Sequence, residues 1–166
     1  SQTNVMVGMY EGQRQDYGRY YRSSRRAECM GCVVAMRYLL DTHIWLWGLL
    51  APERLDDDVI QVLEDEENEL FISPITVWET LILAEKGRIE LTPSPSEWIV
   101  EALQQSPVKE ARLTHTIAIK SRSIELPHQD PADRFIAATA WENDLVLITA
   151  DSKLQESEQI KLLRMS

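Results

Sequence analysis

The sequence has few of the features that mark membrane, secreted or nucleotide-binding proteins. It contains two cysteines in 166 residues, too few for the disulfide framework of a small secreted domain. After residue 35 its only glycines are Gly48 and Gly87, so the folded part has neither a GxGxxG motif nor a P-loop. A GxSxG hydrolase motif is missing as well. Because no run of about 18 uncharged apolar residues exists, we expect no membrane span and a cytoplasmic protein.

Basic residues are also scarce. The chain has 17 Lys and Arg against 27 Asp and Glu, a net charge of −10, which argues against binding nucleic acid through a generally basic surface. The charge is unevenly divided, because residues 1–35 hold five arginines and three acids, whereas residues 36–166 carry a net charge of −12. We interpret residues 1–35 as a flexible extension (an upstream start, an expression remnant or a partner-binding arm) and residues 36–166 as the folded domain.

Two features of the extension are interpreted as incidental. Cys29 and Cys32 have the spacing of a zinc or redox pair, but there is no second cysteine pair and no strand and helix pattern around them. The arginines that precede residues 30–35 resemble the start of an export signal. The apolar stretch is too short for one, and Glu28 interrupts the approach to it. We therefore expect neither a zinc site nor export.

From Met36 onward, short apolar segments alternate with segments of helical periodicity. Strands are predicted at residues 37–40, 70–72, 108–113, 145–148 and 160–163. Helices are predicted at residues 42–50, 55–67, 74–86, 114–124 and 131–141. A further helix is predicted to end near residue 103 and to begin after either Ser94 or Ser96 as its cap. Ser73-Pro74 and Asp130-Pro131 are typical helix starts. The order predicts an α/β fold, a three-layer sandwich with a short, mainly parallel central sheet, and core positions for the five tryptophans.

Four acids are predicted to meet at one edge of this sheet. Asp41 and Asp151 each follow an apolar strand, and ligands of parallel sheets bind at the carboxyl ends of the strands. Glu79 and Asp133 lie early in two helices that should pack against the same edge. Crowded carboxylates raise one another's pKa, and a hard divalent cation such as Mg²⁺ or Mn²⁺ removes that repulsion. The sequence therefore predicts a metal-dependent site for phosphate esters.

Each of these acids also has a structural interpretation. Taken alone, Asp133 is better explained as a first-turn acid beside the helix cap Asp130, and Asp151 as a loop or capping residue. The structural alternatives for Glu79 are a side chain that extends its carboxylate to solvent and a pairing with Lys86, which lies two helical turns away. Asp41 is harder to explain structurally, because it places a charge ahead of an apolar helix. We favour the metal site because all four acids point to it together.

Four segments, in this order, carry a resemblance to a known family: Tyr38–His43, Ser73–Glu79, Asp130–Ala140 and Leu147–Asp151. They resemble the motifs of PIN-domain ribonucleases, in particular VapC-type toxins of toxin–antitoxin pairs. The resemblance covers residues 36–166 and none of the extension. It implies a PIN-like fold and a Mg²⁺- or Mn²⁺-dependent endoribonuclease whose catalytic and metal-binding acids are Asp41, Glu79, Asp133 and Asp151.

The resemblance also implies partners and supporting residues. Family members usually form homodimers and are inhibited by a small antitoxin, here a VapB-like protein. Because the folded domain is acidic, RNA would be bound through the metal and through local bases such as Arg112, Lys120 and Arg134. Thr149 matches the small hydroxyl residue that often accompanies the last acid in this family. The other candidates for a supporting or substrate role, which the resemblance does not assign, are Thr42, Arg134, His43 and His128, the two histidines because they lie near Asp41 and Asp133 in the sequence.

Two other functions fit the sequence less well. One is a catalytically silent PIN-like scaffold that binds an antitoxin or another protein, and the presence of all four acids argues against it. The other is a phosphatase with an aspartyl nucleophile, which needs a second Asp two residues after the first. That position is His43 here. The identity of the RNA and the number of metal ions stay open.

Overall fold

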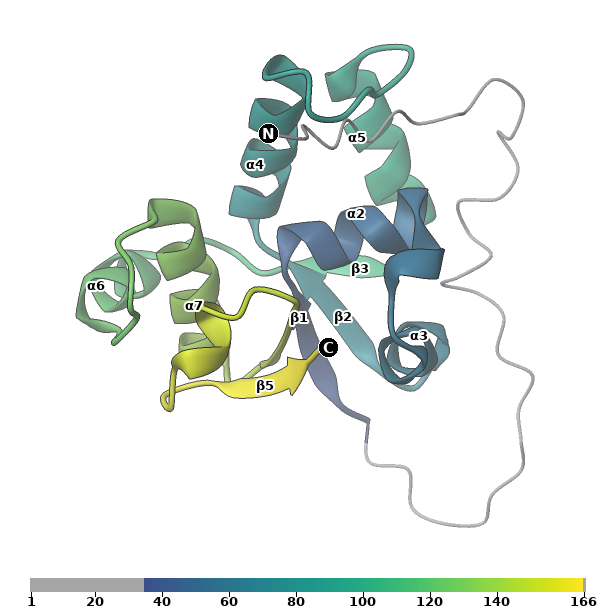
Figure 1. Cartoon of the computed structure of the whole chain (residues 1–166). Helices are drawn as coiled ribbons and strands as arrows, with labels where there is room; N and C mark the ends of the chain where they lie inside the picture. The colour runs from purple at the N-terminus through teal and green to yellow at the C-terminus, as the bar shows by residue number, and fades with distance from the viewer. Residues whose placement is uncertain (1–34, 166) are drawn as a thin grey trace, which may run out of the picture.

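The computed structural model describes residues 35–165, which form a central sheet of five parallel strands (Figure 1). The strands lie in the order β3-β2-β1-β4-β5. Their bounds are β1 Arg37–Leu40, β2 Glu69–Ile72, β3 Val108–Glu110, β4 Val146–Thr149 and β5 Lys161–Arg164. In the register, Leu39 of β1 pairs with Phe71 on one side and Leu147 on the other. The predicted parallel sheet is confirmed. The predictions for the N-terminal extension fall, apart from Ala35, outside the described residues.

Six α-helices connect these strands, and each predicted helix is found. Their bounds are α2 Thr42–Leu50, α3 Asp57–Glu64, α4 Pro74–Glu85, α5 Pro95–Gln105, α6 His115–Ser123 and α7 Pro131–Asn143. Short 3₁₀ turns lie at Pro52–Arg54 and Leu154–Glu156. The Ser73 hydroxyl accepts a hydrogen bond from the Ile75 N–H, and Asp130 accepts from the first N–H groups of α7, so both predicted helix starts are confirmed.

The strand predicted at residues 108–113 is shorter than expected. β3 ends at Glu110, and the last backbone bond to its neighbour runs from the Ala111 N–H to the Ile72 carbonyl. Beyond Ile72 the neighbouring chain turns into α4, so residues 112 and 113 have no strand partner to pair with.

Successive strand residues point to opposite sides of the sheet, so both faces carry apolar side chains. Helices cover both of these faces. Leu39 and Leu147 pack with Ile136 and Ala137 of α7. The other face carries a cluster that includes Leu40, Leu70, Ile72 and Ile148 of the strands, together with residues of α2, α3 and α5. The predicted three-layer sandwich is therefore confirmed, with α6 and α7 as one layer (Figure 1). None of the helices in residues 35–165 is long and apolar enough to cross a membrane.

Helix α4 links the two helical layers at the carboxyl end of the sheet. It contacts α2 and α5 on one side and α7 on the other. Its residue Ile75 packs with the α7 cluster, whereas Val77 and Leu81 pack with the α2 cluster. This position brings the polar residues of α4 close to the points where β1 and β4 end.

The expectation that the tryptophans are core residues is only partly correct. Trp45 and Trp98 are buried and meet edge to face with their ring centroids 6.0 Å apart. For Trp78 the expectation is wrong, because its side chain is 52% exposed. The buried positions of α4 are Thr76 and Thr80, and a residue two positions from each lies on roughly the opposite side of a helix.

Candidate active site

Four elements bring the predicted acids to the carboxyl end of the sheet. Asp41 follows β1 directly, and its N–H donates to the Ile148 carbonyl of the neighbouring strand β4 at 3.0 Å. Asp151 follows β4, Glu79 lies in the second turn of α4, and Asp133 lies in the first turn of α7. The charges of Asp41, Glu79 and Asp151 all raise the pKa of Asp133. The structure therefore brings the four carboxylates into one electrostatic cluster.

Asp41 is buried and is held by two hydrogen bonds. Its Oδ1 accepts from the Thr42 N–H at 2.8 Å, which makes it the N-cap of α2, and its Oδ2 accepts from the Thr149 hydroxyl at 2.7 Å. Burial raises the pKa of Asp41 and outweighs these bonds, and the charge of Asp151 raises it further. One carboxylate therefore begins a helix and carries an unfavourable buried charge.

Thr149 and Asp151 form the β4 side of the cluster. The Thr149 hydroxyl donates to Asp41 and accepts from the Asp151 N–H at 3.0 Å. The Asp151 Oδ1 accepts from the Lys153 N–H at 2.8 Å, so the interpretation of Asp151 as a loop residue is also realised, whereas the N-cap of the 3₁₀ turn that follows is Lys153. Thr149 thereby fixes two of the acids relative to each other, as a supporting residue would.

Thr42 connects Glu79 to the same cluster. Its hydroxyl donates to Glu79 Oε1 at 2.6 Å and lies 3.4 Å from the Thr76 hydroxyl. Burial is the largest cause of the raised pKa of Glu79, and the charges of Asp41 and Asp130 add to it. Thr42 therefore touches two of the acids, because its N–H binds Asp41 and its hydroxyl binds Glu79.

Asp133 has a strongly raised pKa. Burial, followed by the charges of Asp41, Asp130, Asp151 and Glu79, raises its pKa to about 7. A carboxyl with that pKa is about half protonated at neutral pH. Asp130 was predicted only as the helix cap. Asp130 also raises the pKa of Asp133, because residues three apart lie on one side of a helix and the two carboxylates are therefore close.

Arg134 does not have the RNA-binding role predicted for it. Its side chain is buried and donates to three backbone carbonyls: from Nε to Ser121 at 2.7 Å, from one terminal nitrogen to Ile124 at 2.8 Å, and from the other to His128 at 3.2 Å. A guanidinium used in this way cannot reach a phosphate. The prediction was wrong because the sequence does not show that the chain before α7 wraps around this residue.

The remaining predicted bases lie on the surface. Arg112 is exposed beyond the end of β3, and Lys120 forms an ion pair with Glu142 at 2.6 Å. His43 is exposed on α2, and its ring centroid lies 5.7 Å from that of Trp47. The Arg54 guanidinium lies 4.5 Å from the same tryptophan ring. The approach of Arg54 to Trp47 could not be predicted from the sequence, because Arg54 lies in the 3₁₀ turn that follows α2.

The acids provide a donor set suited to a hard cation, although they are not arranged as a finished site. Within residues 35–165, no three His, Cys, Asp or Glu side chains are grouped closely enough to hold a metal ion. The four acids would offer carboxylate oxygens as ligands, which Mg²⁺ and Mn²⁺ prefer. A divalent cation would also remove the repulsion that raises the pKa of Asp41, Glu79 and Asp133. The residues therefore fit such a cation chemically.

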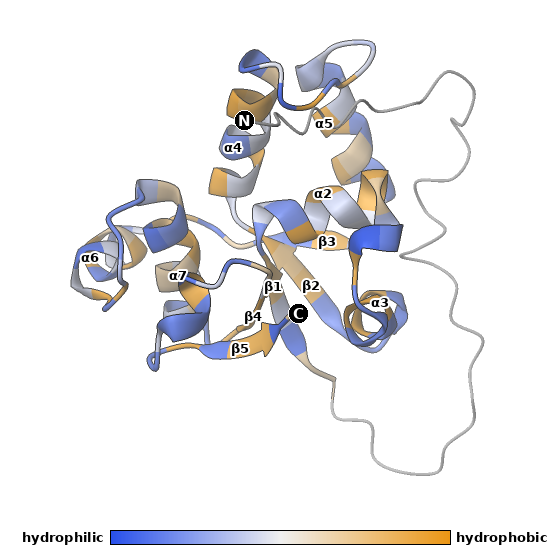
Figure 2. Ribbon diagram, in the orientation of Figure 1, coloured by the Kyte–Doolittle hydropathy of each residue, from blue (hydrophilic) through white to orange (hydrophobic). Residues whose placement is uncertain are grey.

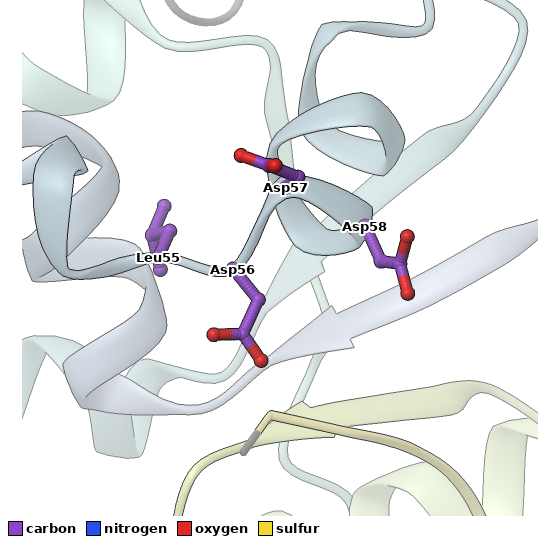
Figure 3. A pocket seen from close by; sticks show the side chains of 4 residues that line it. All are labelled: Leu55, Asp56, Asp57 and Asp58. Atoms are coloured by element: carbon purple, nitrogen blue, oxygen red, sulfur yellow. The ribbon is translucent and has the colours of Figure 1, made fainter.

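A second group of acids is arranged differently. Asp56, Asp57 and Asp58 line a pocket at the start of α3 together with Leu55. Figure 3 shows their carboxylates pointing in different directions. They come from consecutive residues at the start of one helix, where acids are favoured by the helix dipole. This group lacks the convergence from several elements that distinguishes the four acids at the end of the sheet.

Comparison with known proteins identifies a family for this chain. Residues 38–158 match the family model of the PIN domain. The chain is 33% identical over 120 residues to Ribonuclease VapC22 of Mycobacterium tuberculosis, an alignment that covers 70% of this chain and 88% of that protein.

Two solved structures show the same fold. A chain of VapBC2 from Rickettsia felis, bound to a DNA fragment from their promoter, aligns with 79% of this chain and 100% of its own length at a TM-score of 0.60 and 16% identity. A chain of DNA-bound VapBC from Salmonella typhimurium aligns with 78% of this chain and 98% of its own length at a TM-score of 0.56 and 19% identity. On the family match and the 33% identical relative, this chain belongs to the PIN domain family.

Proposed function

We propose that the protein is a divalent-metal-dependent endoribonuclease and the toxin of a toxin–antitoxin pair. The observation that carries this proposal is the cluster of four carboxylates, three of which have a raised pKa because they are buried close to other acids. Such a cluster destabilises a fold and is typical of a functional site. The similarity to a protein named as a ribonuclease supports RNA as the substrate.

The roles of the acids follow from their positions. Asp41, Asp133 and Asp151 would hold Mg²⁺ or Mn²⁺, and Glu79 would complete the cluster. A divalent cation there supplies a Lewis acid that lowers the pKa of a water molecule and offsets the charge of a phosphate. In this proposal Glu79, which accepts from the Thr42 hydroxyl, would orient or deprotonate the attacking water. Thr149 keeps Asp41 and Asp151 in register at the ends of their strands.

The acidic surface also bears on the partners. With a net charge of −12 over residues 36–166, the domain would bind RNA through the cation and through local bases such as Arg112. The same surface would favour a basic segment of a VapB-like antitoxin, as the similarity to chains from VapBC complexes supports. A homodimer in the cytoplasm is part of this proposal.

The test is RNA cleavage by the purified chain. Defined RNAs are incubated with Mg²⁺, with Mn²⁺ or with EDTA, and cleavage is expected only with a metal. Asp41→Asn and Asp133→Asn should each lower the rate more than about a hundredfold, since loss of outer-shell partners alone costs about 10- to 100-fold. Asp58→Asn is the matched control, because it removes an exposed acid of α3 outside the cluster and should cleave like the wild type.

Three results would contradict the proposal. Cleavage that persists in EDTA would reject the metal, and cleavage that persists in both cluster variants would reject the assigned acids. A wild-type chain that cuts no RNA but binds its antitoxin would favour the catalytically silent scaffold. Toxicity on expression that Asp41→Asn relieves and Asp58→Asn does not would identify the chain as the toxin.

A further inference from the structure

His128 lies against the acid cluster but is not one of its acids. It belongs to the connection between α6 and α7, and its side chain is 15% exposed. Its Nε2 lies 3.5 Å from Asp133 Oδ2. This nitrogen is buried and has no hydrogen-bond partner among the described residues. Buried polar groups in folded proteins are nearly always paired, and the Asp133 carboxylate is an acceptor close to this unpaired nitrogen.

The other ring nitrogen shows which atom carries the proton. The Asp130 N–H donates to His128 Nδ1 at 3.2 Å, so Nδ1 is an acceptor. In a neutral imidazole the proton is then on Nε2, which faces Asp133 as a donor. The hydrogen bond from Asp130 thus fixes both the tautomer and the direction of the ring.

The backbone of His128 is held as firmly as its ring. Arg134 donates to the His128 carbonyl at 3.2 Å, and its other nitrogens bind the Ser121 and Ile124 carbonyls in the same segment. Arg134 directly follows Asp133 in the sequence. Arg134 therefore ties the backbone of His128 to the same helical turn that carries Asp133.

We propose that His128 is the positioning residue for Asp133, donating from Nε2 to Asp133 Oδ2 and leaving the other carboxylate oxygen available to a divalent cation. This inference rests on the proposed metal-dependent function. Ligating carboxylates usually carry a hydrogen bond from a second residue, and loss of that residue weakens metal binding about 10- to 100-fold. The Asp130 bond to Nδ1 alone would give His128 a purely structural role, so the test must separate the two ring nitrogens.

Two amide substitutions make that separation. His128→Asn places its amide near the former Nδ1, so it keeps a partner for the Asp130 N–H but has no donor that reaches Asp133. His128→Gln places its amide near the former Nε2 and keeps that donor. In the full chain, Mn²⁺ binding is measured by the electron paramagnetic resonance signal of free Mn²⁺, alongside thermal unfolding without metal. We expect His128→Asn to bind Mn²⁺ about tenfold more weakly, and His128→Gln to recover most of that loss.

Each outcome decides the matter. If the two variants bind Mn²⁺ equally, whether as tightly as the wild type or equally weakly, the positioning role is rejected, and a matching loss of thermal stability would assign His128 to the fold instead. A wild-type chain that binds no Mn²⁺ would reject the proposed function together with this inference. A wild type that binds Mn²⁺ and cleaves RNA, with indistinguishable variants, would reject only the role of His128.

Discussion

The acidic side chains at the two ends of the sheet have opposite electrostatic surroundings. At the amino-terminal ends of the strands, Glu69 lies 2.6 Å from Lys109 and 3.5 Å from Arg37, and Asp144 lies 2.8 Å from Lys161. These bases hold the pKa of both carboxyls below their ordinary values. Figure 2 shows β2 changing from polar at this end to apolar toward the other, so the charges here lie at the rim of the core.

At the carboxyl-terminal ends the acids face one another instead. Burial and mutual repulsion raise the pKa of Asp41, Glu79 and Asp133. The nearest base in sequence, Arg134, donates to backbone carbonyls and leaves these acids uncompensated. The same residue types are thus stabilising at one end and destabilising at the other. Carboxylates whose pKa is raised in this way are typical of functional sites, which supports the proposed site at the carboxyl-terminal ends of the strands.

The largest change in stability is expected from removing the buried side chain of Arg134. Arg134→Met leaves three carbonyl oxygens without their donor, and each unsatisfied buried group costs about 1–3 kcal/mol. The free energy of unfolding should fall by about 3 kcal/mol or more, measured by urea denaturation followed by circular dichroism. Arg122→Met, the same change at an exposed position of α6, is the control and should have little effect. An unchanged midpoint for Arg134→Met would show that the guanidinium is not a structural clamp.

A smaller change in stability, this time a gain, is expected from removing the charge of Asp133. In the folded protein the pKa of Asp133 is about 7, above its ordinary 3.8, so the folded state binds more protons than the unfolded state between these values. Stability without metal therefore falls as the pH rises through this window. Asp133→Asn removes the effect and should raise Tm by about 2–4 °C at pH 8, a discounted figure because the side chain is partly exposed. The gain should shrink steadily from pH 7 to pH 4.

This prediction is checked by thermal unfolding in EDTA across that pH range. Asp133→Asn must not be less stable than the wild type at pH 8. A variant that lost stability there would show that the carboxylate is compensated in the folded state, and the contrast between the two ends of the sheet would disappear.

The smallest effect is expected at the opposite end. Glu69→Gln removes the partner of Lys109 and Arg37, but the Glu69 side chain is 40% exposed, and exposed ion pairs contribute little. Tm should fall by about 1 °C or less at pH 7. Because the folded pKa of Glu69 is lowered, this contribution is present above its ordinary pKa and is lost as the pH falls through the folded value. Thermal unfolding at low and high salt measures it, since screening should reduce the effect. If Glu69→Gln lowered Tm by more than Asp133→Asn raised it, the proposed difference between the two ends of the sheet would be wrong.

The elements could be predicted from the sequence because their signals are local. Ser73-Pro74 and Asp130-Pro131 specify helix starts within a few residues, and the aliphatic runs before Asp41 and Asp151 specify strands. The meeting of the acids could be predicted as well, because parallel strands place their carboxyl ends at one edge.

The side-chain partners could not be predicted in the same way. Arg134 is buried only because residues 121–128 fold over it, which depends on the path of the chain between α6 and α7. The donor role of His128 depends on a backbone N–H two residues later. The exposure of Trp78 depends on which side of α4 faces α2 and α7, and its neighbours in the sequence are too apolar to show this.

Asp41 is both the N-cap of α2 and a proposed metal ligand, so the choice of substitution decides whether the protein can be inactivated without loss of stability. The Asp41 carboxylate caps α2, whose residues Ile44, Trp45 and Leu46 are fully buried. An alanine at position 41 would remove the cap as well as the charge, at a typical cost of about 1 kcal/mol, whereas asparagine keeps the capping oxygen. A well-folded but inert form for binding or crystallographic work is therefore best made with asparagine. In a genetic screen for harmless forms of the protein, alanine at this position would mix lost chemistry with lost folding.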